Sequence, residues 1–246
     1  MTATTVAPLD TLSPDALAAE LYGSPERRVA LVRRAALAGV AEAQMVLGQL
    51  LLDGRDLPRD AAAAFGWFTV AARADHLPAV NMVGRCYDLG WGVAVDKGMA
   101  ARWYRTAAQR GLDWGMYNYG TLLALGHGVP QDRAAGLAWF GRAADMGNAK
   151  AANFVGSFHE DGWVVPVDLA EAARCYAVAA EGGDFRGAFN HARMMIAAGD
   201  LDAAYPWLER SAAGGNARFR AQAAAWLRAH GDPACAGWGR LFDLAA

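Results

Sequence analysis

The sequence predicts an all-α solenoid built from paired helices, and two observations carry the prediction. First, glycines, aspartates and alanine pairs recur every 36 residues, as Gly48, Gly84 and Gly120 illustrate. A fixed period of this length is typical of repeat architectures. Second, the apolar residues within each period follow helical spacing. A single helix pair cannot bury both of its apolar faces, so neighbouring units must stack and share one core.

The repeat is defined by a fixed order of residue types. An apolar residue and a glycine stand near the start of each unit, and a second glycine and then an aspartate follow. An aromatic pair, an alanine pair and a closing glycine complete the unit. The repeated positions are Gly48, Gly84, Gly120 and Gly156; Gly54, Gly90, Gly126 and Gly162; Asp60, Asp96, Asp132 and Asp168; Trp67-Phe68, Trp103-Tyr104, Trp139-Phe140 and Cys175-Tyr176; Ala71-Ala72, Ala107-Ala108, Ala143-Ala144 and Ala179-Ala180; and Gly111, Gly147 and Gly183.

Helix chemistry explains these choices within one unit. Between Trp103 and Gly111 the apolar residues fall on one face of a second helix. Asp96 stands at its N-cap, where a carboxylate accepts backbone N–H bonds, and Gly111 suits its C-terminal end. Gly84 lies inside the first helix, where glycine costs about 1 kcal/mol relative to alanine. Its repetition predicts a close helix contact, which we expect against the alanine pair of the second helix.

The elements follow one another along a single solenoid domain. We expect helix starts at Ser13-Pro14 and Ser24-Pro25, because serine caps a helix and proline suits its first position. We expect Phe242 and Leu244 to cover the C-terminal end of the stack, which solenoids require. The predicted parts are a loose N-terminus at 1–12, capping helices at 13–39, five repeats at 40–215 (units 40–75, 76–111, 112–147 and 148–183 and a shortened fifth), and capping helices at 216–246.

Composition narrows the possible functions. An apolar fraction of 54% and nine tryptophans supply a sizeable core, while a net charge of -2 and a pI near 6.2 give no electrostatic footprint for nucleic acid. Three cysteines without regular spacing favour a reducing compartment over a disulfide framework. The first residues lack a basic segment, and no apolar run reaches the roughly 18 residues of a membrane span. We expect a cytoplasmic monomer that binds neither nucleic acid nor membrane.

The unit from Ala79 to Gly111 resembles the Sel-one-like repeat, a relative of the tetratricopeptide repeat. The resemblance rests on the Val83-Gly84 step, on the Gly90-Trp91-Gly92-Val93 loop and on the aspartate, aromatic and alanine positions given above. The resemblance covers about residues 24 to 230. The sequence departs from the family's pattern at Asp75, at Cys175 and in the short fifth unit. It implies a curved, right-handed α-solenoid that serves as an adaptor or scaffold for other proteins, usually without catalysis.

In tetratricopeptide-like solenoids the first helix of each pair lines the concave surface, so its side chains flanking the core position are candidates for partner binding. We expect the amide and cationic members to donate hydrogen bonds to a partner's backbone or carboxylates, and Trp114 and Tyr117 to supply apolar anchoring. The alternative is that Asn81 and Asn153 bridge neighbouring first helices and that Trp114 packs on the next repeat. The candidates are Asn81, Arg85, Asp88, Trp114, Tyr117, Lys150, Asn153, Glu160, Arg186 and Arg193.

The sequence contains no pattern that indicates catalysis, a metal or a cofactor. His127, His159 and His191 lack H-E-x-x-H or C-x-x-C ligand spacing. His159 and His191 fall at repeat-core positions, where we interpret them as hydrogen-bonded core histidines, and His127 lies in a turn between paired helices. The Gly90-Trp91-Gly92 turn is not a phosphate loop, because no strand precedes it. Cys86 has no neighbouring base that could make it a nucleophile. We therefore expect no cofactor and no catalytic residue.

These observations predict a non-catalytic adaptor or scaffold that binds a partner protein or peptide in the concave groove. From the resemblance, two alternatives stay open. One is an accessory subunit of an enzyme such as an iron- and 2-oxoglutarate-dependent hydroxylase. The other is a hydrolase of the β-lactamase-like branch, whose repeats carry paired cysteines that this sequence lacks. A third alternative is a structural spacer, for which substitutions in the groove would leave function unchanged.

Overall fold

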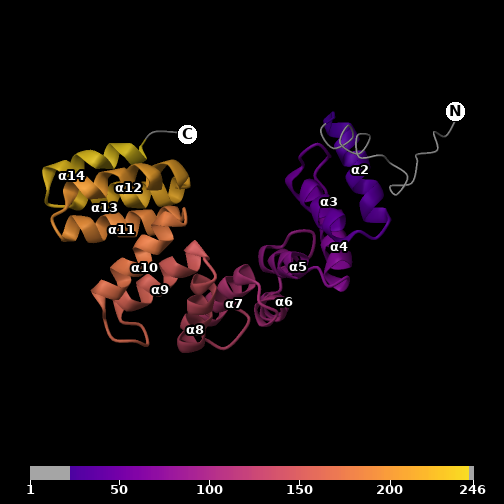
Figure 1. Ribbon diagram of the computed structural model, residues 1–246, viewed down its shortest axis with the longest axis horizontal. Helices are drawn as coiled ribbons and strands as arrows, with labels where there is room; N and C mark the ends of the chain where they lie inside the picture. Colours follow the sequence, from indigo (N-terminus) through magenta and orange to yellow (C-terminus); the bar gives the residue numbers. More distant parts are fainter. Residues whose placement is uncertain (1–22, 244–246) are drawn as a thin grey trace. The chain divides into compact units, whose positions relative to one another are not determined.

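A computed structural model describes residues 23–243 and shows an all-helical chain (Figure 1). Within that range there are thirteen α-helices, one 3-10 helix and no strand, so the predicted all-α fold is confirmed. The expected loose N-terminus, the helix start at Ser13-Pro14 and the covering role of Leu244 lie outside the described residues. The contacts divide the protein into two compact units, one reaching Gly115 and including His127–Val129, the other holding Met116–Gly126 and the residues from Pro130 onward.

In the first unit, consecutive helices pack against each other in pairs from α2 to α6. The helix over Ser24-Pro25 begins as expected, with Pro25 at its first position. Helix α7 begins in this unit and continues into the second. The bounds are Pro25–Leu37 for α2, Ala41–Asp53 for α3, Ala61–Arg73 for α4, Leu77–Leu89 for α5, Lys97–Gln109 for α6 and Asp113–Leu125 for α7.

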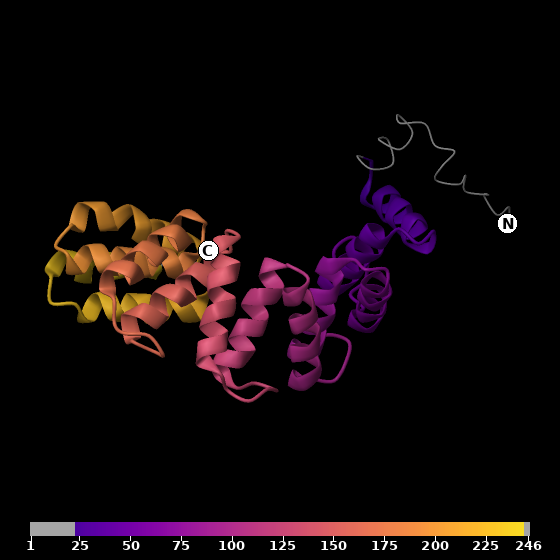
Figure 2. The same ribbon diagram turned by 60° about the horizontal axis from the view of Figure 1, so that its bottom comes forward.

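In the second unit, each helix from α8 to α11 packs on its successor, and the first helices α9 and α11 of adjacent repeats also touch. Helices α11 to α14 lie side by side at the C-terminal end (Figures 1 and 2). The bounds are Arg133–Asp145 for α8, Ala149–Asp161 for α9, Leu169–Glu181 for α10, Phe185–Ala197 for α11, Leu201–Gly214 for α12, Ala217–Ala229 for α13, Pro233–Trp238 for α14 and Gly239–Phe242 for the 3-10 helix η2.

The predicted helix ends are confirmed. The carboxylate of Asp96 accepts a hydrogen bond from the Met99 N–H at 2.9 Å, and Asp60, Asp132 and Asp168 cap their helices in the same way. The closing Gly111 has a φ of 92°, a left-handed conformation that favours glycine. Asp75, which replaces the glycine of the first full unit, takes a φ of 61° at the same place. Aspartate tolerates this conformation better than most residues, so the helix pair still ends there.

The glycine inside each first helix contacts a different partner from the one expected. A Cβ added at Gly84 would lie 2.7 Å from the ring of Tyr104, the second aromatic residue of the pair, and Gly156 meets Tyr176 likewise. The expectation of a contact with the alanine pair is therefore wrong. The alanine pair packs against the next helix, α7, instead, since a Cβ at Gly115 would lie 2.6 Å from the Cβ of Ala107. Both contacts need small residues on one side, which explains their repetition.

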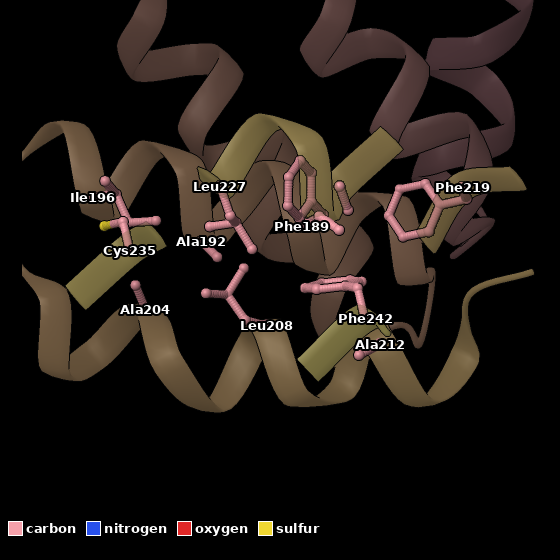
Figure 3. Close-up of a cluster of buried hydrophobic side chains, with 12 residues drawn as sticks. Phe189, Ala192, Ile196, Ala204, Leu208, Ala212, Phe219, Leu227, Cys235 and Phe242 are labelled. Atoms are coloured by element: carbon pink, nitrogen blue, oxygen red, sulfur yellow. The ribbon is translucent and has the colours of Figure 1, made fainter. Parts of the chain in front are cut away.

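The C-terminal end of the second unit is closed by an aromatic and aliphatic cluster (Figure 3). Phe189 of α11 packs edge-on against Phe219 of α13 and Phe242 of η2, with ring centroids 5.7 and 5.9 Å apart. Leu208 and Leu227 fill the space between these helices. The expected covering role of Phe242 is confirmed, because its side chain is buried in this cluster.

Candidate functional site

The second unit contains a pocket of about 290 Å³ along its first helices. Four of the ten residues predicted to face a partner line it, and two further lining residues, Phe154 and Asp184, were missed by the sequence analysis. Phe154 directly follows the predicted Asn153, and Asp184 is the N-cap of α11. The lining residues are Tyr117, Lys150, Asn153, Phe154, Asp184 and Arg186.

Two of the lining residues form an ion pair in which the aspartate is buried and the lysine is partly exposed. The Nζ atom of Lys150 lies 3.4 Å from Oδ1 of Asp184, whose side chain is 2% exposed. The other oxygen of Asp184 accepts the backbone N–H of Gly187 at 2.8 Å, because this aspartate also caps α11. Burial raises the pKa of the Tyr117 hydroxyl, and the Asp184 carboxylate adds to that rise. Asp184 is therefore already compensated by other groups of the same protein.

Arg186 is held at the pocket by aromatic rings. Its guanidinium carbon lies 4.6 Å from the ring centroid of Phe185 and 5.7 Å from that of Phe219. Cation–π contacts of this kind orient a guanidinium while leaving its N–H groups available. Among residues 23–243, none accepts a hydrogen bond from this guanidinium. Arg186 thus presents unused donors beside the pocket.

A series of hydrogen bonds connects the pocket to neighbouring repeats. Arg193 donates to both oxygens of Glu160 at 3.1 and 3.0 Å and to Oδ1 of Asn190 at 3.2 Å. Asn190 in turn donates from Nδ2 to Oδ1 of Asn153 at 2.8 Å. The hydroxyl of Tyr176 donates to Glu160 at 2.6 Å. Burial is the main cause that raises the pKa of Tyr176, and this hydrogen bond is the second. Asn153 therefore bridges first helices α9 and α11, as the alternative interpretation proposed.

The arrangement of stacked helix pairs matches a known family. A model of the Sel1 repeat matches residues 41–76, 77–112, 115–148, 149–184 and 192–216. The chain belongs to the Sel1 repeat family. These matched ranges agree closely with the four full units predicted from the sequence, and the fifth is matched only from residue 192. Sel1 repeats generally mediate protein interactions.

Solved structures of other proteins are similar in fold. A Sel1 repeat protein from Oxalobacter formigenes is 23% identical with a TM-score of 0.78 and covers 92% of this chain and 98% of its own. A protective antigen of uropathogenic Escherichia coli with an SLR fold is 28% identical with a TM-score of 0.73 over 93% of this chain. This chain spans about half of that antigen, 52% of its length. An immunity protein from Pseudomonas aeruginosa is 23% identical with a TM-score of 0.51, covering 73% and 72%. No curated protein matches the sequence.

Other predicted residues lie in the first unit, apart from the pocket described above. Arg85 stacks on Trp91 with its guanidinium carbon 4.7 Å from the ring centroid. The carboxylate of Asp88 accepts bonds from Lys97 at 2.6 Å and from the Tyr104 hydroxyl at 3.3 Å, so it is engaged within its repeat. A second pocket, of about 410 Å³, is lined by Gln49, Leu52, Asp53, Arg59, Arg85 and Trp91.

The remaining two candidates of that unit differ in burial. Asn81 is 7% exposed, so its side chain is largely buried. Trp114 is 46% exposed and presents much of its indole to solvent. Exposed tryptophans are frequent binding hot spots, and a role of Trp114 toward a partner stays a prediction.

The histidines differ in burial. His127 is exposed in its loop, the turn between paired helices in which the sequence analysis places it. His159 and His191 are half-buried, but their Nδ1 atoms are buried without a hydrogen-bond partner in the described part of the protein, so the expectation that they are hydrogen-bonded through these atoms is wrong. Burial lowers the pKa of His191. Within residues 23–243 no three or more His, Cys, Asp or Glu side chains gather in a way that could hold a metal.

The three cysteines are buried and unpaired. Burial raises the pKa of the Cys86 and Cys175 thiols to about 11, so both are protonated near neutral pH. The thiolate is the nucleophilic form. These protonated, buried thiols are therefore suited to packing in the core rather than to nucleophilic catalysis. None of the helices between residues 23 and 243 combines the length and the apolar character that crossing a membrane requires.

Proposed function

We propose that this protein is a non-catalytic scaffold that binds a segment of a partner protein along the first helices of its second unit. One observation carries the proposal: the pocket there is lined by Tyr117, Lys150, Asn153 and Arg186, four residues that face a partner in the sequence prediction. Arginine and tyrosine are the residue types that most often dominate binding energy at interfaces. Three buried thiols without disulfides fit the reducing cytoplasm, where we place the protein as a monomer.

The rigidity of the surroundings supports a binding role. Asn153, Asn190, Arg193 and Glu160 form a continuous hydrogen-bonded network across two repeats. Side chains held in place before binding lose less conformational entropy when a partner arrives. The network therefore serves to fix the pocket wall, and the binding energy comes from the open donors and aromatic surfaces.

A comparative affinity purification tests the proposal. The intact protein, the groove variant Lys150→Glu/Arg186→Glu and the control variant Arg142→Glu/Arg210→Glu are immobilised and exposed to lysate of the source cells. Arg142 and Arg210 are also arginines stacked on tryptophans, at 4.4 and 4.6 Å, but neither lines the pocket. We expect a protein that the intact protein and the control retain and the groove variant loses, with all three folded by circular dichroism. Equal retention by all three would place binding elsewhere.

The same experiment separates the alternatives. A captured partner that is an oxygenase would favour the accessory-subunit alternative. Purified intact protein that hydrolyses a β-lactam reporter would contradict the non-catalytic proposal. An intact protein that captures nothing, and whose groove variant supports normal growth, would favour the spacer.

A further inference from the structure

The hydrogen-bond network determines which atom Asn153 offers to the pocket. Arginine can only donate, so the two bonds from Arg193 require that the acceptor atom of Asn190 is its Oδ1. The amide nitrogen of Asn190 must then be the atom that donates to Asn153. Asn153 consequently accepts through Oδ1, and its own Nδ2 is left as a donor at the pocket wall. Arg193 sets this direction, and Glu160 holds Arg193 in place through two further bonds.

The other polar groups of the pocket are donors as well. Arg186 keeps its guanidinium N–H groups unused within the described residues, because aromatic stacking alone holds it. Lys150 has three donors, of which Asp184 engages one at 3.4 Å. Asp184 itself is buried and its second oxygen is taken by a backbone N–H. A ligand entering this pocket therefore meets donors and positive charge.

The charge balance distinguishes between kinds of anion. Lys150 and Arg186 carry two positive charges and Asp184 one negative charge, so the pocket has a net charge of about one positive unit. A monoanion matches this value. A phosphate group carries nearly two negative charges near neutral pH, and it would also lie close to the Asp184 carboxylate.

The apolar walls indicate what accompanies the anion. The ring of Phe154 is stacked on Phe140 at 4.8 Å and lies 5.8 Å from Tyr117. The rings of Phe154 and Tyr117 line the pocket together with the donors. A peptide with an apolar side chain beside its acidic group would cover both surfaces at once.

The geometry points to a carboxylate of the partner segment, borne by an Asp or Glu side chain or by the segment's C-terminus, as the group that this pocket binds. The inference rests on the proposed function, which it makes specific. The guanidinium of Arg186 can donate two parallel N–H bonds to the two oxygens of a carboxylate. Asn153 and Lys150 complete the set of donors.

Binding of degenerate peptide libraries to the intact protein tests this inference. Each fluorescein-labelled heptapeptide library has one fixed central residue, which is Glu, Gln, phosphoserine or Lys. The other positions are random and the C-terminus is amidated. A fifth library has central Gln and a free C-terminal carboxylate. Fluorescence anisotropy reports the affinity of each. We expect the Glu library or the free-carboxylate library to bind about tenfold tighter than the Gln amide library, and the two acidic libraries distinguish a side-chain carboxylate from a terminal one.

The variant Asn153→Asp is the sharpest probe of the donor. An aspartate there still accepts the bond from Asn190, so the network survives, but its second oxygen replaces the donor and repels an anion. We expect Asn153→Asp and Arg186→Gln to lose the preference for the carboxylate, and the control Arg210→Gln to keep it. Circular dichroism confirms that the variants remain folded.

The outcomes separate this inference from the proposed function. Equal binding of the Glu and Gln libraries, lost in Arg186→Gln, would overturn the carboxylate and leave the peptide site in place. Tighter binding of the phosphoserine or the Lys library would also overturn it. An acidic preference that survives Asn153→Asp and Arg186→Gln would place the anion elsewhere. If the intact protein binds no library, the proposed site and the inference fail together.

Discussion

Arg193 and Glu160 form a two-point ion pair between neighbouring first helices, with Nη1 and Nη2 of the arginine 3.1 and 3.0 Å from the two carboxylate oxygens. Each side chain is 23% exposed, so water compensates either charge poorly once the other is removed. The pair ties α9 to α11 and sets the direction of the hydrogen bonds that reach Asn153.

Removing one member of this pair destabilises the second unit. We expect Arg193→Met to lower the free energy of unfolding by roughly 1–3 kcal/mol, because Glu160 is left with an unpaired charge. The double variant Arg193→Met/Glu160→Gln should recover part of that loss. Urea unfolding followed by circular dichroism measures the two single variants, Arg193→Met and Glu160→Gln, and the double variant. Single costs that simply add in the double variant would show that the two side chains are not coupled.

The contact between the repeat glycine and its aromatic partner gives a second prediction. Gly84→Ala should destabilise the protein by roughly 1–3 kcal/mol, because the new Cβ would lie 2.7 Å from the packed ring of Tyr104. Gly66, in the second helix of the preceding repeat, has no atom within 4 Å of an added Cβ. Gly66→Ala should therefore stabilise the protein by up to about 1 kcal/mol through helix propensity. Thermal unfolding of both variants checks the opposite signs.

The helix ends were predictable from the local sequence, and the contacts between helices were not. Asp96 capping and the left-handed Gly111 follow from local helix chemistry. The partner of Gly84 was misassigned because a shift of a few residues on a helix changes which side chain faces the neighbour. The amide orientation of Asn153 depends on Asn190, 37 residues away at a position that is not its repeat equivalent. No repeat pattern could indicate that bond.

The same contrast explains why Asp184 was missed as a pocket residue. The structure shows that Asp184 is the N-cap of α11. Its second role, the ion pair with Lys150, depends on how closely two helix starts approach. Periodicity alone does not specify that distance.

A strained loop residue in the fourth repeat gives a third prediction. Val164 has a φ of 59°, where the equivalent residues are Gly92 and Gly128. A branched side chain in this conformation costs roughly 1–2 kcal/mol. Val164→Gly should therefore stabilise the protein by about 0.5–1 kcal/mol after the added freedom of the unfolded state is subtracted. Calorimetry of the variant measures the change, and a lower melting temperature would contradict the strain.

The reverse substitution provides the matched control for that loop. A Cβ at Gly92 would lie 2.0 Å from the carbonyl oxygen of Ala61, at the start of the preceding second helix. Gly92→Val should destabilise the protein by more than roughly 2 kcal/mol, since steric overlap is added to the backbone strain. If Gly92→Val destabilises the protein by no more than Val164→Gly stabilises it, the loops of the two repeats are interchangeable.

His191 gives a prediction for the dependence of stability on pH. Its ring packs edge-on against Trp207 with centroids 5.2 Å apart, and burial holds its pKa below the ordinary value of 6.5, with Glu181 opposing the shift. The unfolded state therefore binds a proton that the folded state resists, and stability falls as the pH drops below about 6.5. His191→Phe keeps the ring contact and removes the titration, so we expect a smaller loss of stability between pH 7.5 and 5.5. The exposed His127→Gln should retain the full loss, and urea midpoints at the two pH values decide between them.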